Sequence, residues 1–582
     1  MTFCVERPAV PVGVWGWLRG HLRRHRWLLA VFAAASVAAN LCATLVPVYV
    51  GEAFAQATGS SPGLAPVAAA AVAAGLLAAG RFVADVLSSG SMEVIAQRVK
   101  RDARDELYRS LLGKRLSFHD QQRIGDLLAR AINDAKLVDY MFSPGIATAF
   151  NGLLALLVPI LFIASMHAWL LLAPGLMVVV FGFALRRHLR RLHPLTMRTR
   201  EAFADLNDRF TTTLSGISTV KAATQEEHER RAFAEAAAAY RDAYVRRGKA
   251  QAVYLPALSF ALVMAVGSLH SLQLYSEGTL TLAQVVTYLG WLVLFAQPVT
   301  MSEQAVPVIQ EGVVAAARMR QIIGGDSSER EDTDGTSASV EGAITFDRVR
   351  LTLDGREILR DVSFHVPAGR TLAVVGPTGS GKSMLTKLVN RMYDATGGRV
   401  LIDGRDVRAW EPGALRRQIG HVDQETFLFS KSVLDNIAFG SPADAGYEAA
   451  YEDVVRAAKQ ACADDFVQGL DQGYATILNE GGTTLSGGQR QRLAIARALL
   501  TDPRILTLDD AMSAVDARTE KTITEAIERV TAGRTTVLVS HRPGQIRRAD
   551  MILLLDAGRV VDQGTHDELM GRCALYREIY SG

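Results

Sequence analysis

The chain has 582 residues, too many for one hydrophobic core, so two or three domains are expected. Its hydrophobic content is 49% and its mean hydropathy is +0.14, high for a soluble protein, which directs attention to apolar spans. A formal net charge of only +3 argues against nucleic acid as the main partner. The four cysteines are scattered without a C-x-x-C spacing, which indicates a reduced compartment and no disulfide framework.

Six long apolar segments precede residue 305, and most reach the ~20 residues that a membrane-spanning helix needs. One such run could be a buried helix of a soluble protein, but six together favour a membrane domain. We therefore expect six transmembrane helices within residues 27–323, after a cytoplasmic or interfacial segment formed by residues 1–26. The apolar segments are Trp27–Val50, Leu64–Val86, Pro144–Met166, Ala168–Leu185, Val253–Gln273 and Leu282–Met301.

Basic residues orient these spans. The short segments 51–63, 167 and 274–281 contain no Lys or Arg, whereas 97–130 and 186–248 are dense with both. The positive-inside rule therefore places both termini and the two long loops in the cytoplasm. The helical composition of those loops predicts that the spans continue far beyond the membrane. Before the first span, "VWGWLRGHLRRHRW" suits a helix in the interface, with both Trp15 and Trp17 among the headgroups.

Few charged residues lie inside the spans. Arg81 and Asp85 are four residues apart near the inner end of the second span, and the spacing favours an ion pair that neutralises itself. Charges in a span can also mark a transport path, so this reading stays open as the alternative. Glu303 and Gln304, at the cytoplasmic end of the sixth span, are candidates for a cavity lining.

Residues 324–339, "GGDSSEREDTDGTSAS", interrupt the apolar pattern. They are polar, acidic and rich in Gly and Ser, which predicts a flexible linker. A second domain is expected at 340–582.

That domain contains a glycine-rich loop between an apolar strand and a helix start, which fits G-x-x-x-x-G-K-[ST]. The glycines let backbone N–H groups and the helix N-terminus converge on phosphate oxygens. Lys382 should reach the β- and γ-phosphates, and the Ser383 hydroxyl should bind Mg²⁺. The predicted ATP-binding loop comprises Gly376, Pro377, Thr378, Gly379, Ser380, Gly381, Lys382 and Ser383.

The stretch "ILTLDD" reads as a buried strand that ends at a metal site. Asp509 should hold the Mg²⁺, through water. ATPase chemistry then usually calls for a glutamate that aligns a water molecule, but the next residue is Asp510, one methylene shorter.

Further motifs in the same order resemble the ATP-binding cassette family. The resemblance implies that Gln424 joins Mg²⁺ to the membrane domain, that His541 contacts the γ-phosphate, and that the loop ending at Asp516 touches an opposite cassette. Glu480–Gly482 resembles the cross-talk loop of exporters. The signature motif, which faces ATP bound to the other cassette, is Leu485, Ser486, Gly487, Gly488 and Gln489.

Six spans ahead of one cassette resemble a half-transporter of the exporter type. The expected fold is an α-helical six-span membrane domain followed by an α/β ATP-binding cassette, with two helices swapped onto a partner. Short coupling helices are expected within Gly125–Asp134 and Ser215–Lys221. Because ATP lies between two cassettes in this family, the resemblance implies a second half-transporter as partner.

Two residues depart from the family pattern. Asp510 replaces the catalytic glutamate, and Leu353 aligns where an aromatic ring usually stacks on adenine. With an intact signature, this pattern is typical of the subunit of a heterodimeric exporter that carries the degenerate site. His541 argues against this assignment, because degenerate subunits of the family often lose the histidine. A slow homodimer is therefore the alternative, followed by a cassette protein that regulates a channel or receptor. A soluble cassette ATPase is excluded by the spans.

The spans themselves do not identify the cargo. Few charges and many Trp, Phe, Met and Ala residues are compatible with a small hydrophobic or amphipathic substrate or with membrane lipids. The expected location is the inner or plasma membrane, with the cassette in the cytoplasm.

Overall fold

The structure is a computed structural model that describes residues 13–58, 64–253, 255–325, 335–440, 447–510, 527 and 529–581. The chain divides into two compact units. The first unit comprises Met1–Leu112 and Ile124–Gly325, and the second comprises Gly113–Arg123 and Asp326–Gly582. A short piece of the amino-terminal half therefore belongs to the carboxy-terminal unit.

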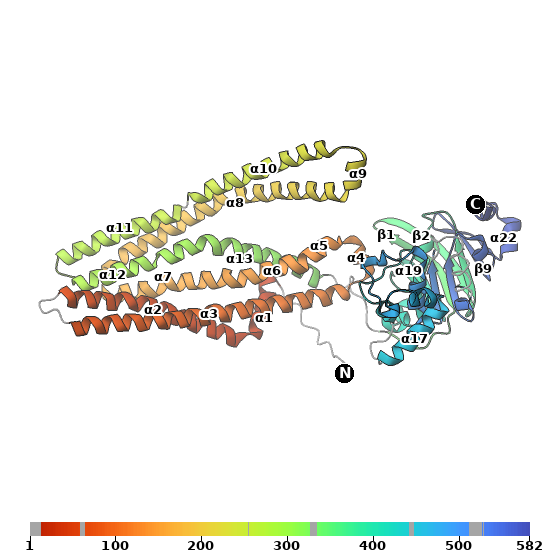
Figure 1. Ribbon diagram of the computed structural model, residues 1–582, viewed down its shortest axis with the longest axis horizontal. Coiled ribbons are helices and arrows are strands. Elements are labelled where there is room, and N and C mark those ends of the chain that lie inside the picture. Colours follow the sequence, from red (N-terminus) through yellow and green to blue (C-terminus); the bar gives the residue numbers. More distant parts are fainter. Residues whose placement is uncertain are drawn as a thin grey trace. The chain divides into compact units, whose positions relative to one another are not determined.

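The first unit is entirely helical, and Figure 1 shows its long helices side by side. Six helical segments of the described chain are long and apolar enough to cross a membrane, as predicted. Each continues past its apolar part, up to 51 residues in the segment Glu226–Ser276. The elements are α1 (Val14–Arg24), α2 (Arg26–Thr58), α3 (Leu64–Leu112), α5 (Ile124–Ala129), α6 (Ala135–Tyr140), α7 (Ala147–Met166), α8 (Leu172–Ser215), α9 (Ile217–Ala222), α10 (Glu226–Ala252), α11 (Leu255–Ser276), α12 (Leu282–Leu294) and α13 (Ala296–Ile323).

Helices α2 and α12 approach closely because glycine removes a side chain at two contact points. A Cβ on Gly290 would lie 2.6 Å from the Cβ of Pro47, and a Cβ on Gly51 would lie 2.2 Å from the Thr287 hydroxyl oxygen. The indole Nε1 of Trp291 donates to the carbonyl of Thr44 at 2.7 Å. These contacts fix one helix against the other inside the apolar part of the unit.

Helices α8 and α10 run side by side, joined by the short helix α9 (Figure 1). Aromatic contacts such as Phe203 on Tyr240 hold the pair together. Helix α9 overlaps Ser215–Lys221, the stretch in which the second coupling helix is predicted.

The amino-terminal helix α1 packs on α3 through a carboxylate. Glu106 Oε2 accepts a hydrogen bond from Trp17 Nε1 at 2.9 Å and lies 3.1 Å from His21 Nε2. Trp15 is exposed, as expected of a headgroup residue, but Trp17 is buried because its indole N–H reaches this partner. The predicted pair Arg81–Asp85 is present, with Nε and Oδ2 3.5 Å apart. The side chains of Glu303 and Gln304 lie outside the described residues.

The second unit is built on two sheets. The four-stranded sheet has the order β2-β1-β4-β5, and the six-stranded sheet has the order β10-β9-β3-β8-β7-β6. In the larger sheet, β3 is parallel to its neighbours β8 and β9, and β7 is parallel to β6 and β8. The strands are β1 (Ile344–Leu353), β2 (Arg356–Val366), β3 (Thr371–Val375), β4 (Gly397–Ile402), β5 (Arg405–Asp406), β6 (Ile419–Val422), β7 (Ile505–Asp509), β8 (Thr535–Val539), β9 (Met551–Asp556) and β10 (Arg559–Gly564).

Helices surround these sheets and divide the interior into separate cores. One core joins both sheets to α14, and another joins the far side of β6 and β7 to a set of helices that includes α17 and α19. The helices are α4 (Leu116–Gln121), α14 (Lys382–Val389), α15 (Pro412–Arg416), α16 (Val433–Ala438), α17 (Tyr447–Gln460), α18 (Asp464–Gln468), α19 (Gly487–Leu499), α21 (Pro543–Ile546), α22 (His566–Arg572) and α23 (Ala574–Ser581).

Candidate nucleotide-binding site

The glycine-rich loop joins β3 to α14 at the carboxyl end of a central parallel strand, where α/β sheets bind ligands. Gly376 has φ 154°, and a Cβ there would lie 1.9 Å from the carbonyl oxygen of Leu555. Gly381 precedes α14 with φ 98°, a left-handed conformation that favours glycine. The loop can therefore present backbone N–H groups and a helix N-terminus to an anion.

Lys382 is buried at the start of α14. Its ammonium donates to the carbonyl oxygens of Gly376 at 2.7 Å and Pro377 at 2.8 Å, so it lies inside the loop. Burial lowers the pKa of Lys382, while the carboxylates of Asp509 and Asp510 act in the opposite direction. A phosphate group near this ammonium would favour the charged form.

Ser383 and Asp509 come together at the edge of the same loop. The hydroxyl of Ser383 donates to Asp509 Oδ1 at 3.0 Å, and Asp509 is only 3% exposed. Burial raises the pKa of this carboxyl group. A hydroxyl and a carboxylate are the oxygen ligands that Mg²⁺ accepts beside nucleotide phosphates, so these residues fit the expected cation. Among the described residues, no group of three His, Cys, Asp or Glu could hold a metal without such phosphates.

Asp510 adopts an unusual backbone conformation. Its φ is 38°, in the left-handed region, and its N–H donates to the carbonyl of Val539 at 3.0 Å. The residue is half-buried, and its short side chain begins from this turned backbone rather than from the end of β7. His541 follows two residues after Val539 and is exposed, so it belongs to the same edge of the sheet.

Gln424 and Leu353 lie on segments that border this edge. Gln424 is exposed, two residues after the end of β6, the strand next to β7. Leu353 ends β1 at a two-residue turn formed by Asp354 and Gly355, with φ 48° and 76°. Positive φ at both positions is typical of a tight hairpin. The half-buried Leu353 packs partly against the core of the sheets.

The signature motif begins α19 with a capping box. Ser486 Oγ accepts from the N–H of Gln489 at 3.3 Å, and the Ser486 N–H donates to Gln489 Oε1 at 2.9 Å. Leu485 and Gly488 are buried, and α19 belongs to the helical core. The glycine-rich loop leads into α14, whose apolar side chains pack in the core of the sheets. Lys382 and the signature motif therefore begin helices that pack in two different cores of the described chain. Asp516 lies outside the described residues.

Hydrogen bonds tie the segment after Gln424 to the signature helix. Arg497 of α19 donates to the carbonyl oxygen of Phe427 and to Asn436 Oδ1, both at 3.1 Å. Asn436 is 1% exposed and bonds both the N–H and the carbonyl of Phe429. These bonds fix the segment from Phe427 to Asn436 against α19. The sequence reading did not identify this connection.

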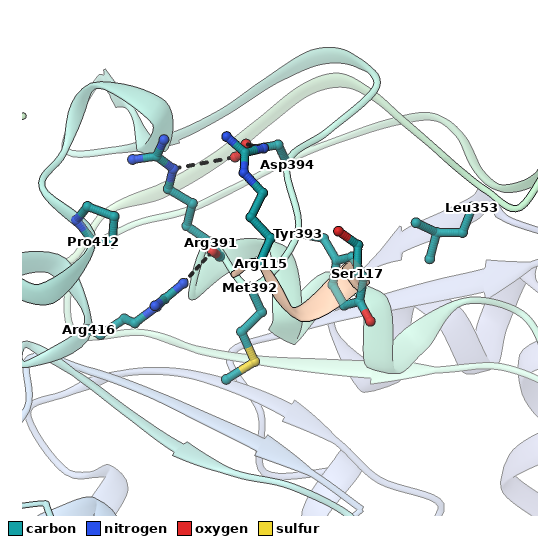
Figure 2. A pocket seen from close by; sticks show the side chains of 9 residues that line it. All are labelled: Arg115, Ser117, Leu353, Arg391, Met392, Tyr393, Asp394, Pro412 and Arg416. Carbon is teal, nitrogen blue, oxygen red and sulfur yellow. Dashed lines mark hydrogen bonds and ion pairs between the residues drawn. The ribbon is translucent and has the colours of Figure 1, made fainter. Parts of the chain in front are cut away.

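Helix α4 is seated on the second unit beside Leu353. Figure 2 shows Arg115 and Arg391 directed at Asp394; Arg115 Nη1 lies 2.6 Å from Asp394 Oδ2. The hydroxyl of Tyr393 donates to Asp120. The side chains of Arg115, Tyr393 and Asp394 are among those that line a cavity of about 140 Å³.

The first coupling helix is predicted within Gly125–Asp134, and the structure has a further short helix just before that stretch. Residues Gly125–Asp134 belong to the long helical segment Ile124–Met166, and the short helix seated on the second unit is α4, Leu116–Gln121. Both stretches have helical composition, and only contacts with Tyr393 and Asp394 distinguish them. The acidic and basic residues of "RLSFHD" were the available signal.

Comparison with known proteins decides what this fold is. Residues 29–299 match the family model described as ABC transporter transmembrane region, and residues 359–513 match the model described as ABC transporter. The chain is 33% identical over 502 residues to the "Uncharacterized ABC transporter ATP-binding protein YknV" of Bacillus subtilis, covering 85% of this chain and 82% of that protein. The chain belongs to the ABC transporter family.

Other relatives agree with an exporter architecture. The "Putative multidrug export ATP-binding/permease protein YgaD" of Bacillus subtilis is 31% identical, over 84% of each chain. An "ATP-dependent lipid A-core flippase" of Chromohalobacter salexigens is 32% identical, over 86% of each chain. The solved structure of a bacterial Atm1-family ABC exporter with ATP bound superposes with a TM-score of 0.81 and 30% identity, covering 97% of this chain and 98% of that one. The protein is therefore an ATPase-coupled, ATP-binding half-transporter of the ABC exporter type, integral to a membrane. Half-transporters of this family generally work as dimers.

Proposed function

We propose that this half-transporter is one subunit of a heterodimeric exporter in which its own ATP site turns over slowly. The observation that carries the proposal is the contrast between two faces of the chain. The signature helix is complete and capped by Ser486, whereas Asp510 places a shortened acid on a left-handed backbone. An acid one methylene short holds an attacking water poorly, so hydrolysis would occur where Ser486 and Gly488 complete the partner's site.

The nucleotide in both sites is ATP with Mg²⁺. Lys382 binds the β- and γ-phosphates here, while Ser383, Gln424 and Asp509 hold the cation. The metal supplies charge neutralisation on the phosphates, and His541 contacts the γ-phosphate.

The substrate is a small hydrophobic or amphipathic molecule or a lipid. The proposal is supported by relatives named for multidrug export and for lipid A-core flipping. Few charges lie inside the six spans, which suits an apolar cargo. Export proceeds from a cytoplasmic cassette outward across the inner or plasma membrane, because the basic loops orient the chain that way.

A homodimer is the second candidate, and His541 favours it. The histidine follows β8 beside the Asp509 strand, where a hydrolytic site would need it. In a homodimer, both sites would depend on Asp510.

Three variants separate these candidates in the complex purified from native membranes. Ser486→Arg places bulk and charge against ATP on the partner and should lower ATP hydrolysis roughly a hundredfold or more. Asp510→Ala should leave most of the hydrolysis rate in place, and Asp510→Glu should raise it by restoring the missing methylene. Steady-state ATPase rates of the three variants, with and without a hydrophobic cargo such as a dye, are the measurement.

If Asp510→Ala is as damaging as Ser486→Arg, Asp510 is a working base and the asymmetric complex is wrong. Mass spectrometry of the same preparation provides an independent check. A second half-transporter with Glu in the Asp510 position is expected, and a preparation that contains this chain alone would favour the homodimer.

A further inference from the structure

An acidic residue that belongs to none of the motifs lies beside Asp509. Strands β6 and β7 are parallel neighbours, with His421 in register with Thr507 and Val422 with Leu508. Asp423 follows Val422 as Asp509 follows Leu508, so both acids stand at the carboxyl edge of adjacent strands. This is the edge that also receives the glycine-rich loop.

A chain of polar side chains holds Asp423 in place. Its Oδ1 lies 2.9 Å from His421 Nε2, and His421 Nδ1 lies 2.8 Å from the hydroxyl oxygen of Thr507. Asn390, at the end of α14, donates to that same hydroxyl oxygen at 3.1 Å. Thr507 and Asn390 are buried and the side chain of His421 is 11% exposed, whereas that of Asp423 is 50% exposed. A bonded polar chain of this kind restricts the orientation of its outer member.

The charges at this edge act on one another. Two ionised acids at one edge repel each other, and a divalent cation between phosphate and protein relieves the repulsion.

We propose that Asp423, positioned by His421, is a second carboxylate for the divalent cation that accompanies ATP at this chain's own site. The inference rests on the proposed Mg²⁺–ATP site at Ser383 and Asp509. Mg²⁺ keeps several waters and needs only one or two carboxylates beside the phosphates, which fits two acids on adjacent strands. His421 is a positioning residue because it acts through Asp423.

The proposal predicts that the Asp423 carboxylate weakens the binding of metal-free ATP and favours the binding of ATP with Mg²⁺. A carboxylate near phosphates repels bare ATP and favours the metal-bound form, so it raises the factor by which Mg²⁺ tightens ATP binding. Asp423→Asn keeps the size of the side chain and an oxygen that can accept from His421, but removes the charge. This variant should lower that factor about tenfold, in line with the loss of a group that supports a metal ligand.

The experiment measures ATP affinity of the full chain in detergent, by displacement of a fluorescent nucleotide, in EDTA and in Mg²⁺. Asp471→Asn is the matched control, because it removes an exposed acid from a loop of the helical core. His421→Leu should reduce the factor as Asp423→Asn does, and His421→Gln should restore part of it through its side-chain N–H. Melting temperatures of all variants ensure that only folded protein is compared.

The outcomes separate the inference from the proposed site. If the parent protein binds ATP equally well with and without Mg²⁺, the proposed cation site fails. If the parent shows the metal effect and Asp423→Asn retains it in full, the site stands and the role of Asp423 is overturned. If His421→Gln and His421→Leu are equally impaired, His421 does not position Asp423 through its Nε2 hydrogen bond.

Discussion

Leu353 occupies the rim of the nucleotide edge, immediately before the Asp354–Gly355 turn. It also lines the cavity beneath α4, together with Ser117 (Figure 2). A leucine there offers apolar contact to a base but no aromatic face, so the purine ring would lose its stacking partner.

Leu353→Tyr should strengthen ATP binding, because base–aromatic stacking contributes ~1–3 kcal/mol. The midpoint of that range corresponds to about a thirtyfold lower Kd for ATP. Leu353→Met, which changes shape without adding a ring, is the control. Equal affinities of the Tyr and Met variants in the same displacement assay would show that adenine does not rest on this residue.

The limits of sequence reasoning are clear for residues at this edge. Lys382 and Ser383 could be predicted because their motif is local, and Asp509 because it ends the strongly apolar strand β7. The sequence shows that Asp510 is one methylene short, but its left-handed backbone and its hydrogen bond to the Val539 carbonyl are visible only in the folded chain. Asp423 was missed although it follows a buried strand as Asp509 does, because its relation to Asp509 exists only once β6 and β7 pair.

At the scale of single elements, few side chains hold α4 against the rest of the second unit. Arg115 and Asp394 form an ion pair of about one-quarter exposure on each side, and Tyr393 bonds Asp120. Helix α4 has only six residues, too few to be stable alone, so these contacts keep it folded.

Arg115→Ala should loosen α4, because the ion pair with Asp394 contributes ~1 kcal/mol at this degree of exposure. Hydrogen exchange at the Leu116–Gln121 amides should quicken about fivefold, while basal ATP hydrolysis stays unchanged and its stimulation by cargo falls. Arg109→Ala is the control, since it removes another loop-proximal ion pair that is far more exposed. Unchanged exchange in Arg115→Ala would show that α4 is held by other contacts.

The interlock of α2 and α12 gives a second test at this scale. Gly290→Ala would bring a methyl group within 2.6 Å of the rigid Pro47 ring, so the helices must separate. Overpacking of this kind costs about 1–3 kcal/mol and should lower the melting temperature in detergent. Gly182→Ala, in α8 with open space around its Cβ, should leave the melting temperature equal or higher. Equal melting of the two variants would contradict the close contact.

Whole elements were easier to predict than their contacts. The six spans could be predicted because an apolar run of sufficient length has few alternatives in a chain with alternating basic loops. The contacts of α4 could not, because several helical stretches follow one another between 113 and 140, and the ion pair of Arg115 with Asp394 distinguishes one of them. Similarly, burial of Trp17 depends on Glu106, 89 residues away.

At the scale of the whole molecule, the basic loops predict the orientation in the membrane. Cysteines can be introduced at Glu277, in the turn between α11 and α12, and at Ser218 in α9, in a chain whose four native cysteines have been replaced. A membrane-impermeant maleimide should label Glu277→Cys in intact cells and Ser218→Cys only after permeabilisation, because cytoplasmic segments carry the Arg and Lys residues. The reverse pattern would invert the topology and place the cassette outside.

Residues Gly113–Arg123 belong structurally to the second unit although they interrupt the first in sequence. The chain therefore passes between the units three times: before Gly113, after Arg123 and again after Gly325. This matters for anyone who exchanges parts between transporters. If only the cassette after the linker were exchanged, α4 of this chain would pack on a foreign cassette. That cassette need not carry the residues that pair here with Arg115 and Asp120. A recombinant protein that keeps the eleven residues with their own cassette should preserve that match, so the unit of modular exchange here is discontinuous.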